Sequence, residues 1–469
     1  MSTTTQEPTT AQAPEDERLP LGRTLLYGFQ HILTMYGGVV SVPLIVGGAA
    51  GMSTAEVGLL VAAALFVSGA ATVLQAWGLP FFGSRLPLVQ GISFASVSTM
   101  TAVVSGDGGI QAVFGSILVA GLFGLVIAPV FSKVVRFFPP VVTGTIITVI
   151  GISLLPVAIR WLMGNNVQDP DYGSVHFILL GAFTLVVTLL CSRVPAISRM
   201  AVLIGIVVGS VVAVPFGLAD FTKVADGAVF ALPQPLAFGT PTFQAGAVIS
   251  MVIVMLVIMT ETTADILAVG EIVGTKVDSR RVADGLRADM LASTLAPVFN
   301  TFPATAFAQN VGVIAMTGIK SRFVVVAGGG MLVLLGLLPV LGRVIASVPY
   351  PVLGGVGIVL FGSVAASGIR MLTRIDWAKN TNQLIVATSI AMGVIPIAMP
   401  TFYDEFPETV ATVFDSGISA AAITAFALNL LFHHVMPASS HKVDDRRHLS
   451  SPAESAQTVE VEGPEGDRP

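Results

Sequence analysis

The chain has 469 residues, of which 54% are hydrophobic and only 11% are charged, and its mean hydropathy is +0.85. Apolar runs of about 20 residues, long enough to cross the hydrocarbon core of a bilayer, recur along almost its whole length and exclude an ordinary soluble protein. The net charge of -5 identifies no partner, and the single Cys191 leaves no disulfide framework or thiolate metal site. We therefore predict an all-α polytopic membrane protein.

Both ends of the chain are polar and rich in Pro, Ser, Thr and Glu. Such segments cannot bury enough apolar surface to offset the entropy of ordering, so we predict disordered tails at residues 1–21 and 437–469. Neither tail has the apolar core of a cleavable signal peptide.

Between the tails, apolar length and the breaks made by Gly, Pro and charged residues predict fourteen membrane spans. The positive-inside rule tests this number, because Lys and Arg should gather in alternate loops if no span has been missed or invented. The approximate spans are 22–46, 55–78, 88–104, 110–131, 140–158, 174–190, 198–216, 245–272, 283–299, 304–318, 324–342, 350–370, 381–400 and 413–435.

The basic residues do alternate between the loops. With a cytoplasmic N-terminus, the outside loops contain only Arg160, Lys223 and Arg343. We therefore expect a multi-pass protein of the plasma (inner) membrane with both termini cytoplasmic. The inside loops contain fourteen of the 23 basic residues: Arg85, Lys133, Arg136, Arg193, Arg199, Lys276, Arg280, Arg281, Arg287, Lys320, Arg322, Arg370, Arg374 and Lys379.

The third and tenth spans are unusual. The segments RLPLVQGISFASVSTM (85–100) and NTFPATAFAQNVGVIAMTG (300–318) are short and polar and carry Gly or Pro where a helix would normally continue. They lie roughly 220 residues apart, each third in its half, which predicts a 7+7 repeat with an inverted second copy. Matching broken spans mark a transporter's central site, because unwound backbone at membrane depth survives only where it lines a cavity. The alternative is that Gly-rich spans merely pack closely.

The predicted eighth span contains two carboxylates in the segment ETTADILAVGEIVG (261–274). Glu261 and Asp265 are one helical turn apart and share a face, which cannot point at lipid because an unpaired carboxylate there costs several kcal/mol. Asp289 on the next span and His31 on the first add titratable groups at depth. Such acids face a cavity, pair with a partner or relay protons. For Asp265 and Asp289, hydrogen bonds that tie helices together are an equally good interpretation, and a lone His31 is more often a packed residue.

These motifs also carry a family resemblance. The run TFPATAFAQNVGVIAMTGIKSR (301–322) resembles the signature of the nucleobase-ascorbate transporters, the second nucleobase-cation symporter family. Its pattern Q/E-N-x-G-x-x-x-x-T falls here on Gln309, Asn310, Gly312 and Thr317. The segments ETTAD (261–265), ADML (288–291), QH (30–31) and SF (93–94) resemble further family motifs, and the match covers roughly residues 20–435 in the same order.

The resemblance implies a fold with two domains and an elevator-like movement of one against the other. A core domain would contain residues 22–137 and 245–345, and a gate domain residues 138–217 and 349–436. The substrate would lie between two short strands of the broken spans, and two copies would form a homodimer through the gate.

The resemblance also implies roles for individual residues. Glu261 would accept hydrogen bonds from ring N–H groups of a nucleobase, Gln309 would complement an imide or lactam edge, and Phe94 would supply an aromatic surface. Ser93 and Ala308 are assigned to the same substrate site. Support of the site or proton coupling is assigned to His31, Asp265, Asp289, Asn310, Gly312 and Thr317, with Asn310 bracing its strand.

The choice of substrate narrows at two positions. Uracil-type relatives tend to have Glu in place of Gln309 and His in place of Asp265, so this chain resembles the xanthine and urate permeases. Val311, Ser93 and Ala304 depart from residues that are common in the family, which leaves xanthine against urate open. Another nucleobase, such as uracil, is the alternative substrate.

The energy source follows from the same carboxylates. No GxxxxGK[ST] segment suggests ATP. A carboxyl group in a cavity can bind and release a proton, so we predict proton symport, with Na+ as the alternative coupling ion. We predict no other cofactor, metal or nucleic-acid partner.

Two other classes of protein are minor interpretations. An anion transporter of the related sulfate and bicarbonate fold would lack Glu261 and Gln309, and a membrane-embedded enzyme would need a nucleophile–base pair or a metal cluster.

Overall fold

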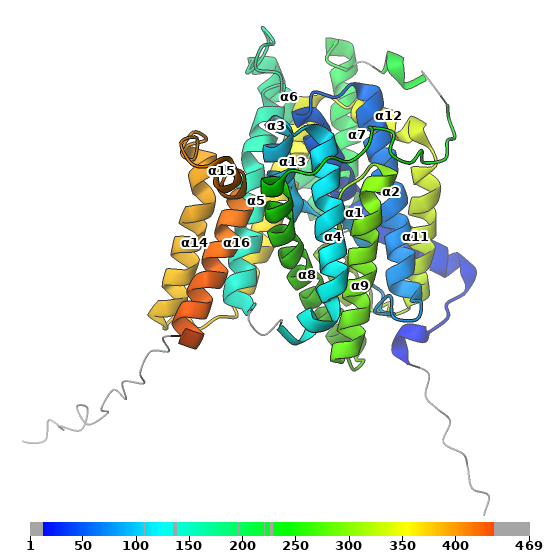
Figure 1. Ribbon diagram of the computed structural model, residues 1–469. Coiled ribbons are helices and arrows are strands. Elements are labelled where there is room, and N and C mark those ends of the chain that lie inside the picture. Colours follow the sequence, from blue (N-terminus) through cyan, green and yellow to red (C-terminus); the bar gives the residue numbers. More distant parts are fainter. Residues whose placement is uncertain are drawn as a thin grey trace, which may run out of the picture.

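The computed structural model describes residues 13–106, 108–134, 138–195, 197–219, 221–225 and 228–435. The described residues are mostly helical (Figure 1), and they include a small two-stranded sheet. Within the described residues, nine helices are long and apolar enough to span a membrane, and a bent pair makes a tenth. A polytopic membrane protein is thus confirmed. The predicted tail 437–469 and the loop residue Arg136 lie outside the described residues.

The long helices agree closely with the predicted spans. They are α1 (Leu21–Ala49), α2 (Thr54–Trp77), α4 (Gly109–Val134), α5 (Pro140–Leu162), α6 (Val175–Arg193), α8 (Ala245–Val273), α13 (Tyr350–Leu372), α14 (Asn380–Ala398) and α16 (Gly417–Leu430), which continues as a π-helical turn to Val435. The shorter helices are α3 (Val97–Ser105), α7 (Ala201–Ala213), α9 (Ser279–Leu295), α10 (Ala308–Thr317), α11 (Arg322–Gly336), α12 (Pro339–Ala346) and α15 (Glu408–Phe414).

The helices pack in two groups. In one, α2 packs against α11 and α12, and α4 packs against α8 and α9. In the other, α5 packs against α13, α14 and α16, and α6 packs against α7 and α13. Figure 1 shows α14 and α16 at the left of the molecule, well separated from α2 and α11 at the right.

Small residues allow the helices to approach closely. A Cβ at Gly28 of α1 would lie 2.8 Å from the carbonyl oxygen of Val324 on α11, and one at Gly69 of α2 would lie 2.6 Å from that of Gly329. Contacts this short leave no room for a side chain. Since lipid tails are as apolar as Leu, close packing of this kind is a main source of helix association in membranes.

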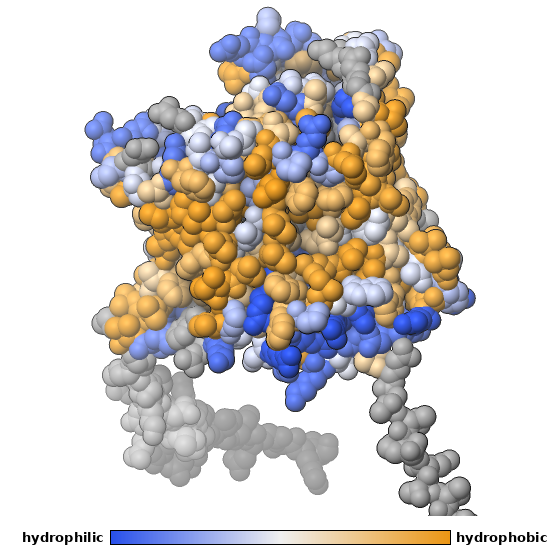
Figure 2. All heavy atoms as spheres, turned by 45° about the vertical axis from the view of Figure 1, so that its right-hand side comes forward, coloured by the Kyte–Doolittle hydropathy of each residue, from blue (hydrophilic) through white to orange (hydrophobic). Residues whose placement is uncertain are grey.

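The outer surface of the helices is apolar. Leu122, Val126 and Val130 recur on one face of α4 and are more than half exposed, and Leu179 and Leu190 on α6 are exposed in the same way. Figure 2 shows an apolar belt between a lower rim rich in hydrophilic residues and a hydrophilic upper end. This is the surface expected of a protein that lies in a bilayer.

The two spans predicted to be broken contain the short strands that the resemblance implies. Strand β1 (Gln90–Ile92) precedes a 3-10 turn and α3, and β2 (Ala304–Ala306) leads into α10. The strands pair antiparallel with Gly91 opposite Thr305. Each strand is followed by a short helix, β1 through the 3-10 turn Phe94–Ser96 and β2 through Phe307, so the N-terminal ends of α3 and α10 lie near the two ends of the ribbon.

Two predicted spans need correction. The expected eleventh span, 324–342, is not one straight helix: α11 ends at Gly336 and α12 begins at Pro339 with a bend of 79°. Proline has no N–H to continue a helix and disfavours helical backbone in the preceding residue, Leu338. The expected fourteenth span, 413–435, crosses the end of α15, and α16 starts anew because the Ser416 side chain accepts a hydrogen bond from the Ser419 N–H (3.3 Å).

The predicted N-terminal tail of residues 1–21 is also partly wrong. Residues 1–12 lie outside the described part, but Pro14–Asp16 form a 3-10 turn that is fastened to the helices. Glu15 is buried and pairs with Arg281 of α9 at 2.7 Å, and Asp16 pairs with Arg322 of α11 at 2.6 Å. The polar composition of this segment predicted disorder. Composition could not reveal the ion pairs that order it, because the partners of these acids lie more than 250 residues away in the chain.

We predict that Glu15→Gln lowers the melting temperature of the purified protein. Arg281 is only 20% exposed and would lose a charge-assisted hydrogen bond to Glu15, which costs about 1 to 3 kcal/mol. The matched control is Asp376→Asn, which breaks an exposed pair with Lys379 (3.9 Å) and should leave the melting temperature unchanged. Equal melting temperatures for wild type and Glu15→Gln would show that residues 13–20 are not held in place by this pair.

Candidate functional site

The ribbon of β1 and β2 is held by backbone hydrogen bonds on both sides of its centre. Ser93 N–H donates to Pro303 O (2.8 Å), and Phe307 N–H donates to Val89 O (3.1 Å). The two bonds are equivalent: in each, the residue that follows one strand donates to the residue that precedes the other strand. The residue after each strand therefore has a fixed position, at the point where a short helix begins.

The carboxyl group of Asp289 on α9 lies against this ribbon. Thr262 of α8 donates a hydrogen bond to it, and the same hydroxyl oxygen accepts one from Ala306 N–H of β2 (3.2 Å). Thr262 and Asp289 are both buried, and the Gln90 side chain is buried beside the carboxyl group. Asp289 therefore ties two helices and a strand together.

Glu261 and Asp265 lie on α8 one turn apart, as the sequence predicts. Glu261 is half-buried, whereas Asp265 is buried and one of its carboxyl oxygens has no hydrogen-bond partner within the described residues. Asp265 interacts electrostatically with both Glu261 and Asp289, and Asp289 interacts with Glu261, so the three acids form one cluster.

His31 and Asn310 form a second buried connection. The His31 Nδ1 atom is hydrogen-bonded to the Asn310 amide oxygen, and the Asn310 amide nitrogen donates to Pro87 O (2.9 Å). Both side chains are almost fully buried. The pair joins α1, α10 and the segment that leads into β1, and it does not present a free surface to a ligand.

The other predicted residues lie where the two short helices begin. The Ser93 hydroxyl caps the 3-10 turn before α3, accepting from Ala95 N–H (3.2 Å). Phe94 is half-buried, with its ring centroid 6.4 Å from that of Phe307 and 5.9 Å from that of Phe361 on α13. Phe94, Phe307 and Phe361 therefore form an aromatic group. The sequence motifs did not predict Phe307 and Phe361 as its members, because contacts between rings on distant elements cannot be read from residue spacing.

On α10, Ala308, Gln309 and Gly312 are exposed and share one face of the helix. The structure thus leaves the Gln309 amide accessible at the end of the ribbon. Thr317 lies at the far end of α10, where its hydroxyl donates only to Val313 O of the same helix (2.8 Å). The structure does not bring Thr317 to the ribbon.

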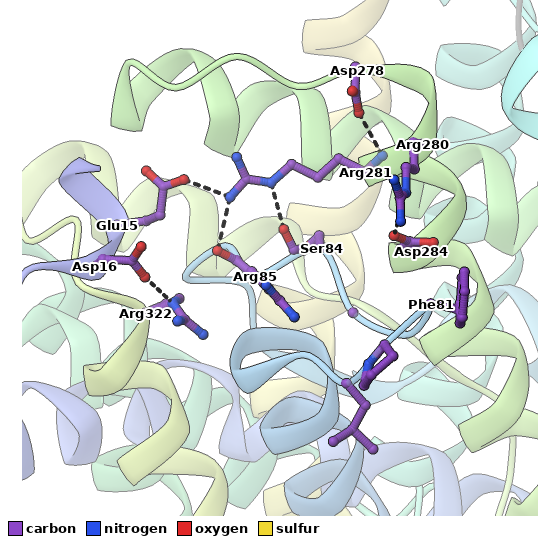
Figure 3. A pocket seen from close by; sticks show the side chains of 13 residues that line it. Glu15, Asp16, Phe81, Ser84, Arg85, Asp278, Arg280, Arg281, Asp284 and Arg322 are labelled. Carbon is purple, nitrogen blue, oxygen red and sulfur yellow. Dashed lines mark hydrogen bonds and ion pairs between the residues drawn. The ribbon is translucent and has the colours of Figure 1, made fainter. Parts of the chain in front are cut away.

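A cavity lined by charged residues lies elsewhere, at the basic end of the molecule (Figure 3). It has a volume of about 400 Å3 and is lined by the N-terminal segment, the loop 79–85 and the start of α9. Figure 3 shows Arg281 crossing it, where its guanidinium donates to Glu15, Ser84 O and Arg85 O. Most of the charged groups that line the cavity form ion pairs with one another. We therefore interpret the cavity as a place where the N-terminal segment, the loop 79–85 and α9 are held together.

Comparisons with known proteins agree with this geometry. A family model described as a permease family matches residues 22–402. The chain belongs to this permease family. The resemblance to the second nucleobase-cation symporter family is thereby confirmed, and the permease is a transporter and not an enzyme.

Two curated relatives match almost the whole permease. It is 40% identical over 414 residues to the xanthine permease of Bacillus subtilis (strain 168), covering 88% of this chain and 94% of the relative. It is 36% identical over 423 residues to the uric acid transporter UacT of Escherichia coli (strain K12), covering 89% and 88%.

Solved structures show the same fold at low sequence identity. The transmembrane domain of the cyanobacterial bicarbonate transporter BicA matches with a TM-score of 0.58 and 14% identity, covering 87% of this chain and 98% of that domain. Murine Slc26a9, an anion transporter in the inward-facing state, matches with a TM-score of 0.59 and 14% identity, covering 89% and 69%. The permease thus shares its fold with anion transporters but belongs to a different family.

We predict that His31 and Asn310 are energetically coupled. His31→Ala and Asn310→Ala should each lower the melting temperature, and the double variant should lose less than the sum, by the equivalent of about 1 kcal/mol, because both substitutions remove one hydrogen bond. Combining His31→Ala with Asn382→Ala on α14 should be additive and serves as the control, because Asn382→Ala removes a separate, part-buried hydrogen bond to Asp376 O in the preceding loop. Full additivity of the first pair would contradict the shared bond.

Proposed function

We propose that the permease carries out secondary active uptake of an oxidised purine, xanthine or urate, across the plasma membrane. The observation that carries the proposal is Gln309: this signature residue is exposed where α10 meets the ribbon, in a chain whose full-length relatives are named for xanthine and uric acid. Gln309 and Asp265 both favour this group over uracil permeases. Uracil or another nucleobase is the second candidate substrate.

The proposed site uses groups from both broken spans and from α8. Glu261 accepts hydrogen bonds from purine ring N–H groups, since a carboxylate is the strongest acceptor at this position. Gln309 offers one donor and one acceptor to an imide or lactam edge, and Phe94 offers an aromatic surface. Ser93 caps the 3-10 turn before α3 and Ala308 begins α10, and the backbone N–H groups at these two starts complement oxygen atoms of an oxidised purine. Gly312 keeps the exposed face of α10 open, and Thr317 ends that helix.

We further propose that the permease has fourteen spans in two inverted repeats of seven. The nine long helices, the bent pair α11 and α12, and the four shorter helices α3, α7, α9 and α10 together supply fourteen. The two packing groups of helices support a core domain (22–137 and 245–345) and a gate domain (138–217 and 349–436). An elevator-like movement of the core past the gate would carry the site across the membrane, with both termini cytoplasmic.

The contacts between the two groups support access from the cytoplasmic side in this conformation. On the opposite side, α3 packs against α15 and α16, and the Thr99 hydroxyl donates to the Ser416 hydroxyl at 2.8 Å. By contrast, Ala308, Gln309 and Gly312 are exposed on α10, which runs from the ribbon toward the basic end of the molecule.

We also propose a homodimer formed through exposed apolar faces of the gate domain, such as that of α6.

Proton symport is the proposed source of energy. The cluster of Glu261, Asp265 and Asp289 supplies carboxyl groups that can change charge as the site opens to each side. Na+ is the alternative coupling ion, because carboxyl and hydroxyl oxygens suit either ion.

Glu261→Gln should abolish purine binding and uptake, whereas Asp265→Asn should retain measurable binding and fail to accumulate substrate. The amide at 261 loses a charge-assisted acceptor worth roughly 1.5 to 3 kcal/mol, and it presents a mismatched donor to a ring N–H. The measurements are titration of the purified protein with xanthine and urate, and uptake at equal surface expression. Normal uptake by Glu261→Gln, or complete loss of binding in a folded Asp265→Asn variant, would contradict these roles.

Uptake of labelled xanthine or urate should rise as the external pH falls below neutral and collapse when a protonophore is added. The reason is that protonation of a carboxyl group in the cluster would accompany substrate entry. Cells lacking their own purine carriers are the appropriate host, with uracil and guanine as comparison substrates. Uptake that persists with the protonophore and requires Na+ would reverse the assignment of the coupling ion.

A further inference from the structure

The central ribbon has two open edges. In an antiparallel pair, residues alternate between those that exchange hydrogen bonds across the strands and those whose backbone groups point outward. The bonds from Ser93 to Pro303 and from Phe307 to Val89 place Gln90 and Ala304 in the outward-pointing set. Their N–H and C=O groups cannot be left without partners at membrane depth.

Two hydroxyl groups meet these edges. On α2, the Thr72 hydroxyl oxygen accepts from Gln90 N–H at 2.9 Å and lies 3.2 Å from Gln90 O. On α9, the Ser293 hydroxyl oxygen accepts from Ala304 N–H at 3.0 Å and lies 3.3 Å from Ala304 O. Both side chains are fully buried. Each hydroxyl therefore holds the N–H group of the first residue of a strand and lies within hydrogen-bond distance of the C=O group of the same residue.

The two arrangements are equivalent by position. Gln90 opens β1 and Ala304 opens β2, and in the antiparallel register they lie at opposite ends of the ribbon. Their partners lie on the helix that precedes each strand, α2 in one half and α9 in the other. Local helix bonding does not account for this pattern. Although Thr72 also reaches Ser68 O (2.7 Å), it accepts the Gln90 N–H independently of where its own hydrogen points.

We propose that Thr72 and Ser293 are positioning residues for the substrate, and this inference rests on the proposed function of the site. Each hydroxyl fixes the start of a three-residue strand, and the strand ends directly before Ser93 and Phe94 or before Phe307, Ala308 and Gln309. A two-stranded ribbon is marginally stable by itself, so its edges must be held for the two helix ends to keep their spacing. Loss of one clamp lowers the fraction of molecules whose site can bind.

The experiment compares four variants with two controls. Thr72→Val and Ser293→Ala remove a clamp, whereas Thr72→Ser and Ser293→Thr keep the hydroxyl. The controls are Thr145→Val on α5 and Ser116→Ala on α4, which are fully buried hydroxyls bonded to their own helix at Val141 O and Val113 O. The KM and maximal rate of xanthine and urate uptake are measured at equal surface expression, and melting temperatures are measured on purified protein.

Removing either clamp should raise KM roughly tenfold or more, because the apparent affinity falls with the competent fraction. The maximal rate should change much less, and the hydroxyl-retaining variants and the controls should keep KM within about twofold. A normal KM in folded Thr72→Val and Ser293→Ala overturns the proposal. An equal rise of KM in the controls overturns it as well, because it would show a general effect of removing buried hydroxyls.

A second measurement separates this inference from the choice of substrate. Hydrogen–deuterium exchange of the segments 88–93 and 302–307 should become faster in Thr72→Val and Ser293→Ala and stay unchanged in the controls. If the wild type neither binds nor transports xanthine or urate, the proposed function fails, and the exchange rates still decide whether the clamps hold the strands. Wild-type exchange in both variants overturns the clamps themselves.

Discussion

The central constraint on this protein is the extended backbone that it places at membrane depth. Within a bilayer, an N–H or C=O group that finds no partner costs several kcal/mol, so non-helical backbone survives only where the protein satisfies it. Here the partners are the opposite strand and the hydroxyls of Thr72, Thr262 and Ser293. Once these bonds are made, α3 and α10 must begin at the ribbon, and their N-terminal dipoles face the same region.

The helices around the ribbon are tied to it and to one another. Asp289 is held by Thr262 between two helices and a strand, and Asn310 joins α10 to α1 and to the segment before β1. Close contacts at Gly28 and Gly69 lock α1 and α2 against α11. A unit built in this way can move as one body, which is what an elevator-like mechanism requires. Its contacts with the other group include a hydroxyl pair at Thr99 and Ser416, a ring contact between Phe94 and Phe361, and packing of α8 against α15 and α16.

Much of this arrangement can be predicted from the sequence because its signals are local. Apolar length predicts the long helices, and Gly and Pro in 85–100 and 300–318 predict the breaks. The four-residue spacing of Glu261 and Asp265 predicts their common face. The family signature then assigns the chain to the permeases, which the comparisons confirm. The bend at Pro339 could also have been predicted from the Leu338-Pro339 step.

Other features depend on pairs of residues far apart in the chain. The polarity of residues 13–20 resembles that of a disordered tail, and only the positions of Arg281 and Arg322 show why they are ordered. Likewise, Thr72 and Ser293 are ordinary residues of helical segments until the strand register places Gln90 and Ala304 against them.

The most direct test of the proposed binding site is a cryo-electron microscopy map of the permease in lipid nanodiscs with saturating xanthine or urate. We expect purine density beside Glu261, between Phe94 and Gln309. Density in the charged cavity near Arg281, with none at the ribbon, would contradict the account.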